Sequence, residues 1–163
     1  MQEGYFYYLS DQYFIDFPDT FLMRNKEMIN GQPHNRPCFF AFKDTYTSLY
    51  WMIPFSSQVD KFRDIYNKKV KKYKYCNTIK FGYVLGYEKV FLVQNMCPVT
   101  DRYILNKYLD NINQMPVQID NVFAKSLVAD AKRVLLLQRQ GKKLIFPDVL
   151  KIEAELLRNK KEL

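Results

Sequence analysis

The order of the apolar patterns along the chain is the feature that most constrains its fold. Runs rich in aromatic and other strand-favouring residues come first, at residues 5–9, 38–43, 49–55, 78–85 and 89–94. Long stretches with apolar residues at helical spacing come mostly later, over residues 121–138 and 149–156. Strands that precede helices are typical of the α+β class, so we expect an α+β fold.

Two pairs of neighbouring runs predict two β-hairpins, with turns at residues 44–48 and 86–88. Pro54 has no N–H to donate to a sheet ladder, so we expect it to end its strand. The polar residues 19–37 predict a long irregular connection. We expect the sheet to curl into a small antiparallel β-barrel with the helices packed outside it.

An amphipathic helix is predicted between the two hairpins. Its apolar residues recur at helical spacing and are Val59, Phe62, Tyr66, Val70 and Tyr73. Ser56 and Ser57 directly precede this helix, at its junction with the preceding strand. Shorter helices are predicted over residues 10–17 and 103–109, and Asp120 can cap the long helix that follows it.

Length and composition favour one compact domain over residues 1–163, because 48% of the residues are hydrophobic and 17% are aromatic. The three cysteines are odd in number and lack CxxC spacing, so we expect a reducing cytoplasm and neither a zinc site nor a disulfide framework. The sequence starts without a basic, signal-like segment and contains no apolar run of roughly 18 residues, so we expect no secretory signal, no membrane-spanning segment and no membrane partner.

The charge balance favours a polyanionic partner, because 25 Lys and Arg residues against 17 Asp and Glu residues give a formal net charge of +8. Much of this charge lies in residues 59–90, which carry nine basic and three acidic side chains. Tyrosines interleave with the lysines, which is typical of a nucleic-acid groove. The alternative is the solvated face of a helix that buries Phe62 and Tyr66, and one helix can do both.

Several catalytic motifs are absent from the sequence. It contains no GxxxxGK[ST], GxGxxG or HExxH motif, and carboxylates do not cluster as a two-metal nuclease requires. His34 is the one histidine, which excludes a histidine-rich metal centre and a ribonuclease with two catalytic histidines. We therefore expect no metal and no cofactor.

The stretch from His34 to Ser57 carries a resemblance to a known family. A basic residue beside Pro37 opens one predicted strand, and the sequence Pro54-Phe55-Ser56-Ser57 closes the next. This arrangement resembles the ToxN/AbiQ/CptN endoribonuclease toxins of type III toxin–antitoxin systems, and is most similar to the CptN-like branch. It resembles more distantly the MazF/Kid ribonuclease barrel. The likeness spans roughly residues 4–137 and includes the basic helix and the hairpin that ends in QNMCPVT.

The resemblance implies a cytoplasmic toxin that cleaves cellular or phage RNA without a metal ion. The RNA 2′-OH would attack the adjacent phosphate to give a 2′,3′-cyclic phosphate and a 5′-OH. The resemblance also implies an antitoxin RNA of pseudoknot repeats, which the toxin cuts from a precursor and then binds in a closed toxin–RNA assembly. Its biological output would be phage defence or plasmid maintenance.

The resemblance also assigns candidate catalytic residues. The family's conserved hydroxyl matches Ser57, with Ser56 beside it, and its basic residue best matches Arg36. ToxN-like members have a lysine there, which leaves open whether Arg36, His34 or Lys43 takes the role. His34 could act as acid or base, since its reference pKa is about 6.5. The predicted RNA-binding residues are Lys43, Lys61, Lys68, Lys69, Lys71, Lys72, Lys74 and Tyr73.

Each candidate also has a purely structural interpretation. Ser56 and Ser57 can cap the helix that follows, and His34 can be a solvated loop residue. Arg36 can form a surface ion pair, and Lys43 can be an ordinary edge lysine. Tyrosines in the first run, Tyr8 among them, fit a core or barrel lining. The rival functions are a non-catalytic RNA-binding module, a MazF-type toxin neutralised by a protein and, more weakly, peripheral membrane binding.

Overall fold

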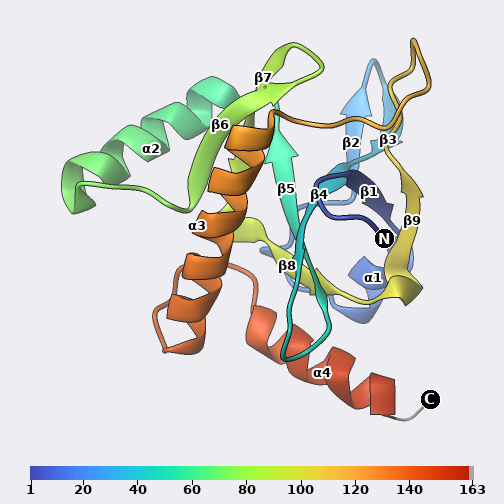
Figure 1. Cartoon of the computed structure of the whole chain (residues 1–163), viewed down its shortest axis with the longest axis vertical. Helices are drawn as coiled ribbons and strands as arrows, with labels where there is room; N and C mark the ends of the chain where they lie inside the picture. Colours follow the sequence, from blue (N-terminus) through green and yellow to red (C-terminus); the bar gives the residue numbers. More distant parts are fainter. Residues whose placement is uncertain (162–163) are drawn as a thin grey trace.

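The computed structural model describes residues 1–161 and contains one antiparallel sheet of seven strands, a separate two-stranded sheet and four α-helices (Figure 1). The strands of the large sheet are β1 (Phe6–Leu9), β4 (Pro37–Lys43), β5 (Tyr50–Ser56), β6 (Ile79–Val84), β7 (Tyr87–Leu92), β8 (Cys97–Val99) and β9 (Ile104–Lys107). The small sheet pairs β2 (Lys26–Ile29) with β3 (Gln32–Asn35). The helices are α1 (Asp11–Asp16), α2 (Val59–Tyr73), α3 (Asn121–Arg139) and α4 (Val149–Lys161). The predicted α+β class is confirmed.

The large sheet is open, so the predicted β-barrel is wrong. Its order is β6-β7-β5-β4-β1-β9, with β8 paired to β5, and among residues 1–161 the edges β6 and β9 do not pair with each other. Helix α3 crosses the sheet and packs on it instead (Figure 1). Gly82 of β6 permits this approach, because a Cβ atom there would lie 2.5 Å from the ring of Phe123. A helix therefore covers the face that strand closure would have enclosed.

Strand β5 lies in the middle of the sheet and changes partner along one of its sides. It pairs with β4 as far as Pro54, with β8 as far as Met52, and with β7 from Phe55. Pro54 therefore falls where β8 has ended and β7 has not yet begun, so its missing N–H interrupts neither ladder on that side. The strand continues to Ser56, and the expectation that Pro54 ends it is wrong.

Apolar side chains are buried on both faces of the sheet. Phe39 belongs to a cluster that Leu127 of α3 covers, whereas Phe40 belongs to one that contains Tyr13 of α1 and Ile152 of α4. Phe39 and Phe40 are consecutive in β4, so their side chains point to opposite faces. Full burial of such a side chain stabilises the folded state by about 1.5–3 kcal/mol. Strand β5 also contributes to both clusters, through Ile53 and Met52, so β4 and β5 stabilise the packing on both faces of the sheet.

Residues 19–37 are more regular than predicted, because they contain the β2–β3 hairpin. Asn30 and Gly31 form its turn, with φ values of 50° and 76°. Positive φ at both central residues defines the tight hairpin turn that an Asn-Gly pair favours. The hairpin could therefore have been found from these two residues.

Residues 103–109 do not form the predicted helix. A short 3₁₀ turn (Asp101–Tyr103) leads into β9, which pairs with β1 through Ile104 opposite Leu9 and Lys107 opposite Tyr7. Thr100 precedes this turn, and its side chain makes no capping hydrogen bond. Pairing with the free side of β1 outweighs the local helix signal.

Other predictions are confirmed. Helices α2 and α3 cover the residues expected from their periodicity, and the carboxylate of Asp120 accepts a hydrogen bond from the backbone N–H of Phe123 (2.9 Å). Strands β6 and β7 form the second hairpin, and α1 begins after Ser10. None of the helices in the described part of the chain combines the length and apolar character needed to cross a membrane.

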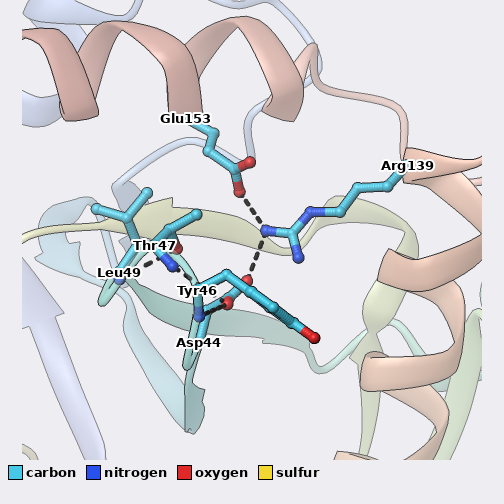
Figure 2. Close-up of polar contacts among 6 residues, drawn as sticks. All are labelled: Asp44, Tyr46, Thr47, Leu49, Arg139 and Glu153. Atoms are coloured by element: carbon cyan, nitrogen blue, oxygen red, sulfur yellow. Dashed lines mark hydrogen bonds and ion pairs between the residues drawn. The ribbon is translucent and has the colours of Figure 1, made fainter.

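An ion-pair network joins α3, the β4–β5 turn and α4 (Figure 2). The guanidinium of Arg139 donates to Asp44 (2.5 Å) and to Glu153 (2.6 Å). The Asp44 side chain is 4% exposed and also accepts from the backbone N–H of Tyr46. Burial raises the pKa of Asp44, but the Tyr46 N–H and Arg139 outweigh burial and hold the pKa below its usual value.

Arg139→Met should destabilise the fold by about 2–4 kcal/mol, because it leaves two partly buried carboxylates without their shared cation. Urea unfolding measures this loss. Arg133→Met, an exposed arginine of the same helix, is the matched control and should change stability by no more than about 0.5 kcal/mol.

The Asp44 contribution to stability should be fully present above the unfolded carboxyl pKa of about 3.9 and lost as the pH falls through the lower folded value. Equal stability of Arg139→Met and wild type would show that the network contributes nothing.

Candidate active site at the end of strand β5

Ser57 lies in the turn between β5 and α2, with its hydroxyl exposed. The ammonium of Lys89 donates a hydrogen bond to the Ser57 Oγ atom (2.7 Å). The pairing of Ser56 with Val90 sets this contact, because it brings Ser57, the residue after β5, opposite Lys89, the residue before Val90 in β7. Lys89 could not be predicted as a site residue, because it meets Ser57 only through this strand register.

Ser56 has a different environment from Ser57. Its side chain is buried, and its Oγ atom accepts a hydrogen bond from the backbone N–H of Gln58 (3.1 Å). This local bond shapes the turn into α2. Ser56 therefore orients the turn that presents Ser57. The expected capping by the two serines is not observed, because Gln58 is the N-cap of α2 and no side chain makes a capping hydrogen bond there.

Arg36 and His34 both neighbour Glu27, a residue of β2. His34 lies directly opposite Glu27 in the β2–β3 hairpin and is exposed. The Arg36 Nη2 atom is 3.5 Å from the Glu27 carboxylate, and the arginine side chain is 25% exposed. Cys38 pairs with Pro54, so β4 begins at the end of the sheet where β5 finishes. Arg36 therefore stands at the same end of the sheet as Ser57.

Two half-buried tyrosines lie close to the residues around this arginine, Tyr8 opposite Pro37 and Tyr108 near Glu27. Tyr8 of β1 pairs with Pro37, the residue after Arg36, and its ring packs edge-on against Tyr108 at 5.9 Å. Burial, and then the nearby Tyr108, raises the pKa of Tyr8. Burial, and then the charges of Asp110 and Glu27, raises the pKa of Tyr108. Both phenols therefore remain protonated donors at neutral pH.

These tyrosines could not be assigned to the site from the sequence. Tyr8 fitted a core position, and Tyr108 fell within the helix predicted over residues 103–109. Only the pairing of β9 with β1 brings the two rings together.

Lys43 lies at the other end of β4, opposite Tyr50, with its ammonium 5.3 Å from the Tyr50 ring centre. The seven residues of β4 span roughly 20 Å at about 3.3 Å per residue, so Lys43 is remote from Arg36. Of the three basic residues left open above, Arg36 and His34 stand at the end of the sheet that carries Ser57, and Lys43 does not.

Helix α2 presents most of its lysines to solvent. It packs on β6 and β7 through its apolar face, which includes Phe62 and Tyr66. The exposed lysines on and just after the helix are Lys61, Lys68, Lys71, Lys72 and Lys74. Among the described residues they have no ion-pair partner, so this face is strongly positive.

Lys69 differs from the other lysines of α2. Its ammonium donates hydrogen bonds to Thr78 Oγ1 (3.0 Å) and Gln94 Oε1 (2.9 Å). It therefore links the helix to the start of β6 and to the turn after β7.

Within residues 1–161, no three His, Cys, Asp or Glu side chains gather closely enough to hold a metal ion. The groups at the end of the sheet that carries Ser57 are hydroxyls, phenols, one imidazole, basic side chains and the Glu27 carboxylate.

Comparison with known proteins identifies the fold. No protein-family model matches the chain, and no curated protein matches it in sequence. A solved structure is similar over almost the whole length of both chains: AbiQ, a lactococcal anti-phage endoribonuclease belonging to the type III toxin–antitoxin system. The TM-score is 0.69 with 16% sequence identity, and the match covers 98% of this chain and 99% of AbiQ. At this identity the similarity establishes that the two proteins share a fold.

Glu27→Gln should lower the pKa of Tyr108, because it removes one of the negative charges that disfavour the phenolate. Titration of the tyrosine ring carbons by NMR measures the change. Asp16→Asn is the matched control, since Asp16 accepts a hydrogen bond from Tyr103 and helps raise the pKa of Tyr103 to about 12. Asp16→Asn should lower the pKa of Tyr103 and leave the pKa of Tyr108 unchanged. An unchanged pKa of Tyr108 in Glu27→Gln would contradict the proximity of Tyr108 to Glu27.

Proposed function

We propose that this protein is an endoribonuclease toxin of a type III toxin–antitoxin system. The observation that carries the proposal is the exposed Ser57–Lys89 pair at the end of β5, at the same end of the sheet as Arg36. A fold shared with AbiQ supports it, because AbiQ is an endoribonuclease of that class. The strongly positive face of α2 supports an RNA substrate.

The proposed reaction is an internal transfer within the RNA. The 2′-oxygen attacks the adjacent phosphorus while its proton passes to a base, and the bond from phosphorus to the 5′-oxygen breaks. The leaving oxygen takes a proton, which gives a 2′,3′-cyclic phosphate and a 5′-OH. Negative charge grows on the phosphate oxygens in the transition state, so preorganised donors and cations should supply most of the rate enhancement.

Each part of this chemistry has a candidate residue. The planar guanidinium of Arg36 has donors beyond those that Glu27 uses and can bind two phosphate oxygens. Lys89 polarises Ser57, whose hydroxyl can then donate to a phosphate oxygen. Tyr8 and Tyr108 are protonated donors beside Arg36, suited to the developing charge or to the leaving oxygen.

His34 is the remaining acid–base candidate. It is exposed in the β2–β3 hairpin, where a bound RNA can reach it, and an imidazole exchanges protons near neutral pH. Ser56 supports Ser57 through the turn and is assigned no direct step.

The exposed α2 lysines are proposed to bind the RNA backbone. Lys61 stands at the start of the helix near Ser57, and Lys68, Lys71, Lys72 and Lys74 continue along it. Lys69 is left out of this surface because its ammonium is engaged within the protein.

An RNA antitoxin is proposed as the partner. The toxin would cut a precursor of pseudoknot repeats and remain bound to the product in a closed toxin–RNA assembly. Its other substrates would be cellular or phage RNA. A tandem array of short repeats in the DNA upstream of the coding sequence, with the same RNA recovered from the purified protein, is the expected result. A small acidic protein encoded beside the toxin and bound to it would contradict this partner.

Ser57→Ala should reduce RNA cleavage in the presence of EDTA by at least about 100-fold, because one preorganised hydrogen-bond donor is typically worth ~10²–10³ in rate. The assay uses refolded, RNA-free protein and mixed-sequence RNA. Ser126→Ala is the matched control, because Ser126 also accepts a hydrogen bond from a lysine, Lys80, on another part of the protein.

The control should cleave at the wild-type rate. Salt-sensitive RNA binding by folded wild-type protein, with no cleavage of varied substrates, would contradict the nuclease and favour an RNA-binding module. Cleavage that Ser57→Ala leaves intact would remove Ser57 from the site.

A further inference from the structure

A cavity lies at the opposite end of α2 from Ser57. Its volume is about 330 Å³, and its walls come from the end of α2, the segment 75–78, the end of α3 and the loop 142–146. The 15 residues of α2, at about 1.5 Å per residue, place this cavity roughly 20 Å from Ser57.

Hydrogen bonds fix the walls of this cavity. The side-chain oxygen of Gln138 accepts from the backbone N–H groups of Leu144 (2.7 Å) and Ile145 (2.9 Å), which holds the loop against α3. The N–H of Phe146 donates to the carbonyl of Gln94 (2.8 Å), whose side chain accepts from Lys69 (2.9 Å). Gln94 thus joins helix α2 to the loop 142–146, so the walls of the cavity are held in place by the fold.

Three aromatic rings with large exposed areas line the cavity. Tyr73, Tyr75 and Phe146 are 56%, 61% and 43% exposed, although aromatic side chains normally bury most of their surface. Exposed rings can serve as stacking platforms for unpaired bases, because every base has a flat face.

The charge of the cavity is entirely positive. Lys142 and Lys143 line it, and Lys69 contributes an ammonium whose hydrogen-bond partners, Thr78 and Gln94, are both neutral. No carboxylate is present among its lining residues, all of which belong to the described part of the chain. An anionic ligand is therefore favoured, and the rings beside the lysines select an aromatic anion, such as a nucleotide.

We propose that this cavity is an exosite that binds one unpaired nucleotide of the RNA, several nucleotides away from the phosphate that is cleaved. The base stacks on Tyr73, Tyr75 or Phe146, and Lys142 and Lys143 bind its phosphates. The exposed lysines of α2 lie at both ends of the helix, with Lys61 towards Ser57 and Lys68, Lys71 and Lys72 towards the cavity, so an RNA backbone can be bound near both sites. The inference rests on the proposed function and adds a subsite that favours single-stranded RNA.

Cys76 provides a reporter inside the cavity. It lines the wall and is partly exposed, whereas Cys38 and Cys97 are buried. Burial raises the pKa of both buried thiols, that of Cys97 to about 12. In the folded protein, a thiol reagent should therefore modify Cys76 alone.

The first experiment measures the rate of Cys76 modification with and without a short single-stranded 2′-O-methyl RNA, which cannot be cleaved by 2′-OH attack. The RNA should slow modification at least about 10-fold at saturation. Inorganic polyphosphate and AMP, each at the same phosphate concentration, should give little protection. Equal protection by polyphosphate would show a merely basic surface, and equal protection by AMP would show a free-nucleotide site. Either result, or no protection by RNA, would overturn the proposal.

The second experiment compares the affinity of Tyr75→Ala and Tyr46→Ala for the same RNA. Tyr46 is 92% exposed in the β4–β5 turn and is the matched control. Loss of a stacking ring should weaken binding by roughly 5- to 100-fold in Tyr75→Ala, and Tyr46→Ala should bind as wild type does. Equal affinities of the two variants would contradict the exosite.

Failure of the exosite and failure of the nuclease give different results. Protection of Cys76 should persist in Ser57→Ala. If wild type fails to cleave RNA but RNA still protects Cys76, the exosite stands and the proposed nuclease does not. If wild type cleaves RNA and Cys76 remains reactive, the exosite alone is wrong.

Discussion

The change of partner along strand β5 is the constraint on which the rest of the structure depends. Beside β4, this strand pairs first with β8 and then with β7, and Pro54 occupies the place between them. A regular ladder on both sides would have excluded a proline there. The same change lets β7 reach the last residues of β5, and the contact between Lys89 and Ser57 follows from that pairing. This one irregular position thus allows the pairing of β5 with β7 that forms the candidate site.

The site combines groups that the fold holds with groups that it leaves accessible. The Ser56 hydroxyl is hydrogen-bonded within the turn into α2, and Glu27 of the β2–β3 hairpin forms an ion pair with Arg36. Ser57 and His34 remain exposed, where an RNA can reach them. Contacts within the protein therefore position the turn and the arginine, and the exposed groups are free to meet a substrate. The positive face of α2 starts at this site and leads to the cavity near Phe146.

Local patterns were sufficient to predict much of the fold. Periodicity predicted α2 and α3, alternation and turns predicted the two hairpins, and the serines were expected at the start of α2. The β2–β3 hairpin was missed although Asn30 and Gly31 carry its signal. The open sheet could not be predicted, because it depends on α3 packing across the strands and on Gly82 admitting Phe123.

The site was predictable only in part, because its contacts join distant segments. Ser57 and Arg36 were candidates from their motif, and the structure brings them to one end of the sheet. Lys89 and Tyr108 could not be identified, since their positions depend on the pairing of β5 with β7 and of β1 with β9. Lys43 was drawn into the prediction by sequence proximity, but β4 carries it away from Arg36.

The most direct test of the account replaces a single 2′-OH in the RNA. A substrate with one mapped cleavage site is prepared with 2′-deoxyribose at the nucleotide whose 2′-oxygen would attack, and in a second version with the same change one nucleotide downstream. The account predicts that the first substrate is not cut at the mapped site in EDTA, and that the second is cut to give a 2′,3′-cyclic phosphate. Cleavage of the first substrate at the same bond would contradict attack by the 2′-OH.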